Sequence, residues 1–141
     1  MSNDSDLETQ WHANQRRRAI QYLEGQGVVH GRLHEVPAWQ VFPHVSLWAV
    51  ESAKSPGWVG WWVICGDCPT DYVTCTGDRT PRSAIEAIAA RWQEAAVLLA
   101  KGEQHPNFTV GNEDSALELA PLLAARAKIL DEWAADDSIW E

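Results

Sequence analysis

Apolar residues recur at the three- to four-residue spacing of an α-helix in three stretches, one near the start of the chain and two in its second half. The first stretch predicts a helix from residue 4 or 5 to about residue 24, where two glycines follow. The second has Thr80 as its cap, Pro81 in its first turn and Gly102 after its end. The third predicts a helical turn at 114–118 and a main helix from about residue 120, because Pro121 would break a longer helix.

Between the first two helices the pattern is that of strands. "VSLWAVES" (45–52) alternates weakly, "WVGWWVIC" (58–65) is apolar on both faces, and "YVTCT" (72–76) is rich in β-branched and aromatic residues. Residues 28–38 indicate a loop with a short extended piece. The sequence therefore predicts an α+β fold, with an N-terminal helix, a three-stranded antiparallel meander and two C-terminal helices packed on the sheet.

The strand at 58–65 holds three of the nine tryptophans. Strict alternation places Trp58, Gly60 and Trp62 on one face of the sheet and Trp61 on the other. We expect the helices after Thr80 to cover the Trp61 face and the first helix to cover the other face only in part. Trp58 and Trp62 are then predicted to form a contact surface, within a homodimer or against a partner. The alternative is a sheet sandwiched by helices, with these side chains in the core.

Length and charge narrow the class of protein. A chain of 141 residues forms most simply one domain, 1–141, in which the first few residues and 136–141 can be flexible. No basic start leads into an apolar run, and the longest apolar run is too short to span a bilayer, so we expect a cytoplasmic protein that does not bind membranes.

The net charge of -9 argues against a nucleic-acid partner and favours a protein partner with a positive surface. The only basic cluster is Arg16-Arg17-Arg18. Three consecutive residues fan around a helix, so this cluster predicts a solvated helix face rather than a phosphate site.

The cysteines and the nearby aspartates carry little chemistry. Cys65, Cys68 and Cys75 are weak metal candidates, because C-x2-C-x6-C lacks a fourth ligand nearby, and we expect no bound metal or cofactor. Asp67 and Asp71 bracket a turn, where such side chains mostly accept hydrogen bonds from backbone amides. They could instead share a proton or a metal, and they are also candidates for partner contact.

Catalytic motifs are absent from the sequence: it has no nucleophile elbow, zinc-protease helix, phosphate loop or dinucleotide fingerprint. Glu8 and His12 can share one helix face, and His12 could then meet another histidine in space, such as His30 or His34. That arrangement would allow metal binding or acid–base chemistry, and otherwise these are surface polar residues. The sequence leans away from an enzyme.

The C-terminal stretch "DEWAADDSIWE" (131–141) holds five acids and no base. Negative charge at the end of a helix opposes the helix dipole, so we expect Arg16–Arg18 or a basic partner to offset it. Trp140 beside these acids is a further candidate for partner contact. The alternative is a frayed, solvated tail.

Several segments together resemble a bacterial family of small, Trp-rich domains of unknown function. They are "WWVICGDCPTDY", "AWQVFPHVSLWAVES", the "PR"-initiated helix with "RW" inside it, and the closing "LAPLLAARA…DEWA". The resemblance implies a small stand-alone bacterial protein and carries no activity or site residues.

We therefore expect a non-enzymatic binding protein that acts by protein–protein interaction, as an immunity protein or antitoxin does when it occludes a toxin. The first alternative is a binder of a small apolar or aromatic ligand in a Trp-lined pocket. The second is an enzyme of unrecognised type that uses histidines or aspartates brought together by the fold.

Overall fold

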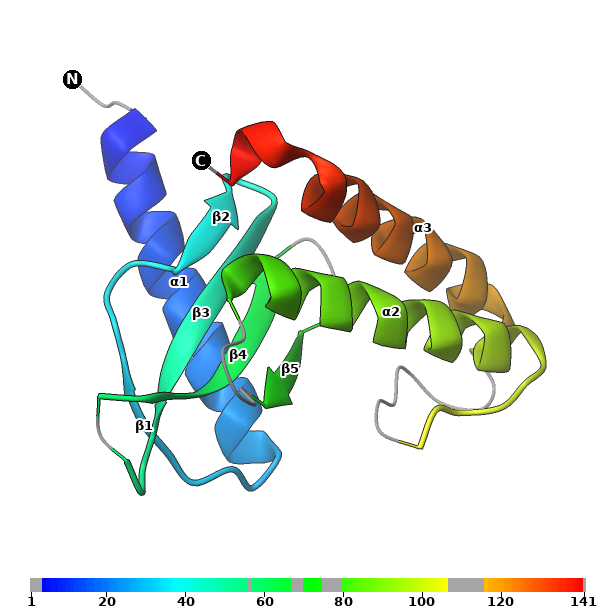
Figure 1. Ribbon diagram of the computed structural model, residues 1–141, viewed down its shortest axis with the longest axis horizontal. Helices are drawn as coiled ribbons and strands as arrows, with labels where there is room; N and C mark the ends of the chain where they lie inside the picture. The colour runs from blue at the N-terminus through cyan, green and yellow to red at the C-terminus, as the bar shows by residue number, and fades with distance from the viewer. Residues whose placement is uncertain (1–3, 56, 67–69, 75–79, 107–115, 141) are drawn as a thin grey trace. The chain divides into compact units, whose positions relative to one another are not determined.

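The computed structural model describes residues 4–55, 57–66, 70–74, 80–106 and 116–140 (Figure 1). The chain divides into two compact units, Met1–Pro81 and Arg82–Glu141, which are described one after the other. Within these ranges the fold is α+β, with three α-helices and a five-stranded antiparallel sheet, so the predicted class is confirmed and the predicted three strands are too few. None of the helices in these ranges is long and apolar enough to cross a membrane.

The first unit combines one helix with the sheet, in which the strand order is β1-β3-β4-β5 and β2 also pairs with β3. All of these pairs are antiparallel. The elements are α1 (Asp4–Gly25), β1 (His30–Leu33), β2 (Trp39–Val41), β3 (Val45–Ser52), β4 (Val59–Gly66) and β5 (Asp71–Thr74).

Strands β1 and β2 lie end to end along the same edge of β3. Strand β2 pairs with the first half of β3, through Trp39 and Leu47, and β1 pairs with the second half, through Leu33 and Val50. The other edge of β3 is occupied by β4. Between β1 and β2 the chain leaves the edge of β3 over residues 34–38 and then rejoins it. Strand β1 corresponds to the short extended piece expected within residues 28–38, whereas the sequence pattern did not reveal β2, which has only three residues.

Helix α1 covers one face of the sheet (Figure 1). Ala19 and Leu23 of α1 pack there in one buried cluster with Trp48, Val63 and Cys65 of the strands, and Trp61 packs against its margin. The expectation that the helices after Thr80 cover the Trp61 face is therefore wrong, because α1 covers it. Leu47, Trp62, Ile64 and Val73 alternate to the other face and are buried as well.

A β-bulge at Gly60 changes which tryptophans share a face. Val50 pairs with Trp61 and Glu51 pairs with Val59, so Gly60 is an extra residue in β4. A side chain on Gly60 would approach the Ser52 Cα to 3.1 Å, which explains the glycine. The predicted alternation is thus wrong before Trp61: the bulge puts Val59 on the Trp62 side of the sheet, and Trp58 falls outside the strand.

The second unit consists of two helices that run side by side in opposite directions, followed by one 3-10 turn (Figure 1). Gln93 donates a hydrogen bond of 2.8 Å to Asp131 between the two helices. The elements are α2 (Pro81–Ala100), α3 (Ala116–Ala135) and η2 (Asp137–Ile139). Ile85, Ile88, Trp92, Leu99, Leu123 and Leu130 are among its buried side chains.

Helix α3 continues through Pro121, which corrects the expected interruption. Pro121 lies in the second turn, where its missing N–H removes a single backbone hydrogen bond, the one to the carbonyl of Leu117. The rest of the helix is rich in alanine and leucine, the residues with the highest helix propensity, and this composition offsets the loss.

Candidate functional site

Trp58 is the most exposed tryptophan of the chain, with 74% of its surface area accessible to solvent. It ends the connection between β3 and β4, where its N–H donates to the Ser55 carbonyl at 3.1 Å and its carbonyl accepts from the Ser52 amide at 2.9 Å. The Glu51 carboxylate accepts a further bond of 3.0 Å from the Gly57 amide. The backbone is therefore held on both sides of Trp58 while its indole faces solvent.

Val29 lies at the same end of the sheet and is 78% exposed. It precedes His30, which pairs with Ser52 of β3, and Ser52 in turn bonds Trp58. Val29 and Trp58 together form what we call the sheet corner. Trp62, the other tryptophan predicted to make partner contacts, is only 5% exposed.

A groove of about 540 Å³ lies between α1 and the loop at 34–38. It exists because the chain leaves the edge of β3 between β1 and β2, which places the loop beside the helix. We call it the α1 groove, and its lining residues are Thr9, His12, Ala13, Arg16, Arg17, Ile20, Gln21, Glu35 and Val36.

Two arginines of the basic cluster of α1, Arg16 and Arg17, line the groove, and Arg18 does not. Arg16 donates from Nε to the His34 carbonyl and from Nη2 to the Leu33 carbonyl, at 3.0 Å each, so it ties the loop to the helix. Arg17 lines the groove, and no residue in the described ranges bonds its guanidinium. Arg18 points elsewhere and donates to the Gly66 carbonyl at 3.3 Å.

A polar relay connects α1 to β2 beside the groove. The Gln40 amide nitrogen donates to the Glu8 carboxylate at 2.6 Å, and the Gln40 oxygen faces Nε2 of His12. Since a carboxylate only accepts, Glu8 fixes the orientation of the Gln40 amide, and Nε2 of His12 must then carry the proton. Glu8 and His12 share one helix face as predicted, with 4.0 Å between their polar atoms, but His12 meets Gln40 rather than another histidine.

Cys65 is buried on β4 in a network that joins the helix to the sheet. Its thiol donates to the Gln15 carbonyl at 3.4 Å, and the Ser46 hydroxyl lies 3.5 Å from its sulfur. Burial raises the pKa of the Cys65 thiol, which disfavours the thiolate that metal binding and nucleophilic attack require. Of the other metal candidates, Cys68 and Cys75 fall outside the described residues, within which no three acids, histidines or cysteines are grouped to hold a metal ion.

Asp71 is the first residue of β5, paired with Ile64, and only 1% of it is exposed. Its carboxylate accepts a hydrogen bond of 2.8 Å from the amide of Tyr72, which is the backbone role expected of it. Its burial leaves it no surface for partner contact. Asp67, the other aspartate of this pair, lies outside the described residues.

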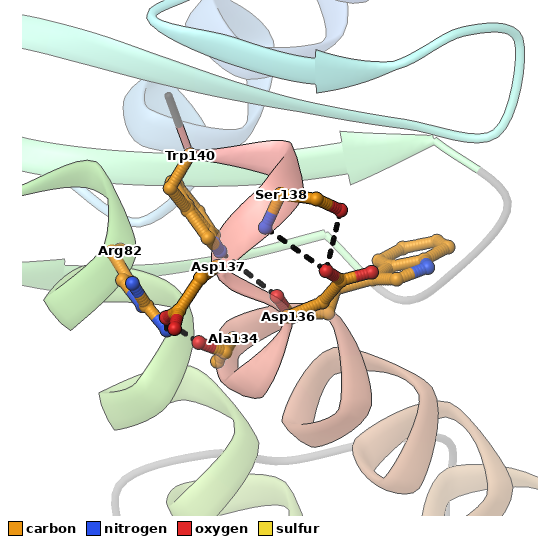
Figure 2. A network of polar contacts seen from close by, with 7 residues as sticks. Arg82, Ala134, Asp136, Asp137, Ser138 and Trp140 are labelled. Carbon is orange, nitrogen blue, oxygen red and sulfur yellow. Dashed lines mark hydrogen bonds and ion pairs between the residues drawn. The ribbon is translucent and has the colours of Figure 1, made fainter.

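The acidic C-terminal stretch folds into a fastened turn (Figure 2). Arg82 of α2 donates to the Ala134 carbonyl and to the Asp137 carboxylate, each at 2.7 Å, and its guanidinium lies 5.9 Å from the ring centre of Trp140. The indole of Trp140 donates to the Trp133 carbonyl at 2.8 Å. Arg82 therefore supplies positive charge beside this stretch, a role that was expected from Arg16–Arg18 or a partner.

Asp136 caps this turn, and its titration provides a test. The Ser138 hydroxyl at 2.6 Å, and after it the Ser138 amide at 3.0 Å, hold the pKa of the Asp136 carboxyl below its usual range. Ser138→Ala removes the stronger donor, so we expect the pKa of Asp136 to rise towards its ordinary value. Carboxyl carbon NMR against pH measures the shift, and Ser138→Thr, which keeps a hydroxyl, should retain the low pKa. An unchanged pKa in Ser138→Ala would show that the hydroxyl bond does not hold the pKa of Asp136 down.

The comparisons with known proteins place the chain in a family. The model of a domain of unknown function (DUF4826) matches residues 5–140, so the chain belongs to this family and the predicted resemblance to such a family is confirmed. No curated protein and no solved structure matches the chain.

Proposed function

We propose that this DUF4826 protein is a non-enzymatic, cytoplasmic binding protein that holds a protein partner at the sheet corner, with Trp58 as the anchor. The observation that carries the proposal is the exposed indole of Trp58 on a backbone bonded on both sides. Tryptophan is enriched among the residues that dominate binding energy in interfaces. Because the backbone at Trp58 is already held by hydrogen bonds, it loses little conformational freedom when a partner covers the side chain.

The area of one indole is sufficient to matter for affinity. Burying about 200 Å² of an exposed tryptophan at about 25 cal/mol per Å² contributes roughly 5 kcal/mol before the costs of association. Val29, 78% exposed, is a second apolar side chain at this end of the sheet. Glu51 lies beside it, and the net charge of -9 favours a partner with a positive surface around an apolar pocket. Occlusion of such a surface is what an immunity protein or antitoxin does.

The test replaces the anchor and leaves the fold intact. Trp58→Ala should change the free energy of unfolding by less than about 0.5 kcal/mol, because the side chain is mostly solvated. It should lower the affinity for the partner captured from the native lysate by about tenfold, measured by calorimetry with the purified partner. Leu122→Ala, which removes an exposed apolar side chain of the second unit, is the matched control and should bind like wild type.

Two outcomes would count against the proposal. If Trp58→Ala and Leu122→Ala bind the captured protein equally well, the sheet corner is not the docking surface. If the captured protein is a second copy of the chain, sedimentation will show a dimer, and homodimer formation replaces occlusion of a different protein.

A further inference from the structure

We propose that the α1 groove is a second binding site, for a small organic molecule that carries an oxyanion, either carboxylate or phosphate, on an apolar body. The site is separate from the sheet corner and does not depend on the function proposed for it. Arg16 and Arg17 would bind the oxyanion, and Ile20 and Val36 would contact the body.

The groove has the size and the firm walls of a ligand site. Its volume of about 540 Å³ falls within the range of roughly 300–1,000 Å³ that is common for small-molecule sites. The two bonds from Arg16 to the Leu33 and His34 carbonyls fasten the loop wall to the helix wall. The groove is therefore formed before any ligand arrives.

The arginines of the groove retain unused charge and donors. Arg16 bonds two neutral carbonyls through Nε and Nη2, so these bonds do not neutralise its positive charge, and three of the five N–H donors of a guanidinium remain. Arg17 has no ion-pair or hydrogen-bond partner in the part of the chain that the structure describes. In a chain of net charge -9, two cations that line one groove without a carboxylate bonded to either favour an anionic occupant.

The remaining lining residues restrict the class of ligand. Glu35 also lines the groove without a partner among the described residues, so it would disfavour a second acidic group on the ligand and accept a hydrogen bond from a donor group. Ile20 and Val36 are apolar, and Val36 is 59% exposed. His12 lines the groove as well, with its Nε2 engaged by the Gln40 oxygen. A single oxyanion on a short apolar body matches this set.

The experiment titrates the full-length, isotope-labelled protein with three probes and follows the groove by NMR. Butyrate and butyl phosphate present the two oxyanions on one apolar body, and butylammonium presents the opposite charge. We expect at least one of the two anions to shift the Nε–H signals of Arg16 and Arg17 in a saturable way. The anion that binds more tightly shows whether the site prefers a carboxylate or a phosphate. Butylammonium should leave these signals unchanged.

Two arginine variants separate direct contact from general electrostatics. Arg17→Ala should weaken the anion at least fivefold, whereas Arg32→Ala removes the same charge from an exposed position of β1 outside the groove and should weaken it less than twofold. Circular dichroism confirms the fold of each variant, and Trp58→Ala should leave anion binding unchanged. The proposal would be overturned if neither anion gave saturable shifts, or if butylammonium bound as tightly as the anions. Equal losses of anion affinity in Arg17→Ala and Arg32→Ala would also overturn it.

Discussion

We expect Gly66→Ala to lower the free energy of unfolding of the first unit by about 3 kcal/mol. Gly66 has φ +137, a conformation that residues with a side chain rarely adopt, and holding alanine in it costs about 1–3 kcal/mol. A Cβ there would collide with the His44 carbonyl oxygen and lie 2.9 Å from the Val45 Cα, and overpacking adds about 1–3 kcal/mol. These obstacles are backbone atoms fixed by the pairing of Val45 with Gly66, so they cannot turn aside as a side chain would.

Gly27→Ala is the matched control for the strained conformation alone. Gly27 has φ +74, and nothing lies within 4 Å of the position its Cβ would take, so we expect a loss of only about 1 kcal/mol. Urea denaturation followed by tryptophan fluorescence compares the two variants. Equal losses would show that the close approach of β4 to residues 44–45 has no energetic weight.

We expect Ser46→Ala to lower the same free energy by about 2 kcal/mol, although it removes only one oxygen atom. The Ser46 hydroxyl accepts the indole N–H of Trp48 at 2.9 Å and donates to the Gln15 side chain at 3.2 Å. Ser46 and Trp48 are 0% exposed and Gln15 is 5% exposed, so water cannot replace either bond. A buried polar group left without a partner costs about 1–3 kcal/mol.

A double-mutant cycle with Trp48→Phe tests whether the network is the cause. Phenylalanine has no N–H, so Ser46→Ala in that background leaves one unpaired group fewer. We expect the losses of unfolding free energy in the two single variants to add up to about 1 kcal/mol more than the loss in the double variant. Strictly additive losses in thermal or urea unfolding would mean that the Ser46–Trp48 bond contributes nothing.

Helices and central strands could be predicted from local signals. Pro81 and Gly102 mark the ends of α2, and the β-branched and aromatic runs correspond to β3, β4 and β5. Local signals fail where pairing decides the outcome. Gly60 is an extra residue only because β3 sets the register of β4, and counting alternate residues cannot reveal that. The placement of two helices on the sheet and the single domain stay predictions.

The candidate sites show the same division. The exposure of Trp58 was expected, although for the wrong reason, since it lies before the bulge rather than on a face shared with Trp62. The α1 groove could not be predicted, because Arg17 and Glu35 line one groove only when residues 34–38 leave the sheet. Recognising β1 and β2 in the sequence would have indicated the loop between them. Each strand is too short for its alternation of apolar and polar residues to be recognised.

The division of one sheet edge into β1 and β2 also affects how the protein behaves at high concentration. A continuous edge strand from residue 30 to 41 would offer a long row of unpaired backbone groups to another chain. The excursion at 34–38 cuts this row into segments of four and three residues, too short to template a stable intermolecular strand. The loop that walls the groove thus protects the sheet from edge-to-edge aggregation, and a deletion that straightened it would sacrifice solubility.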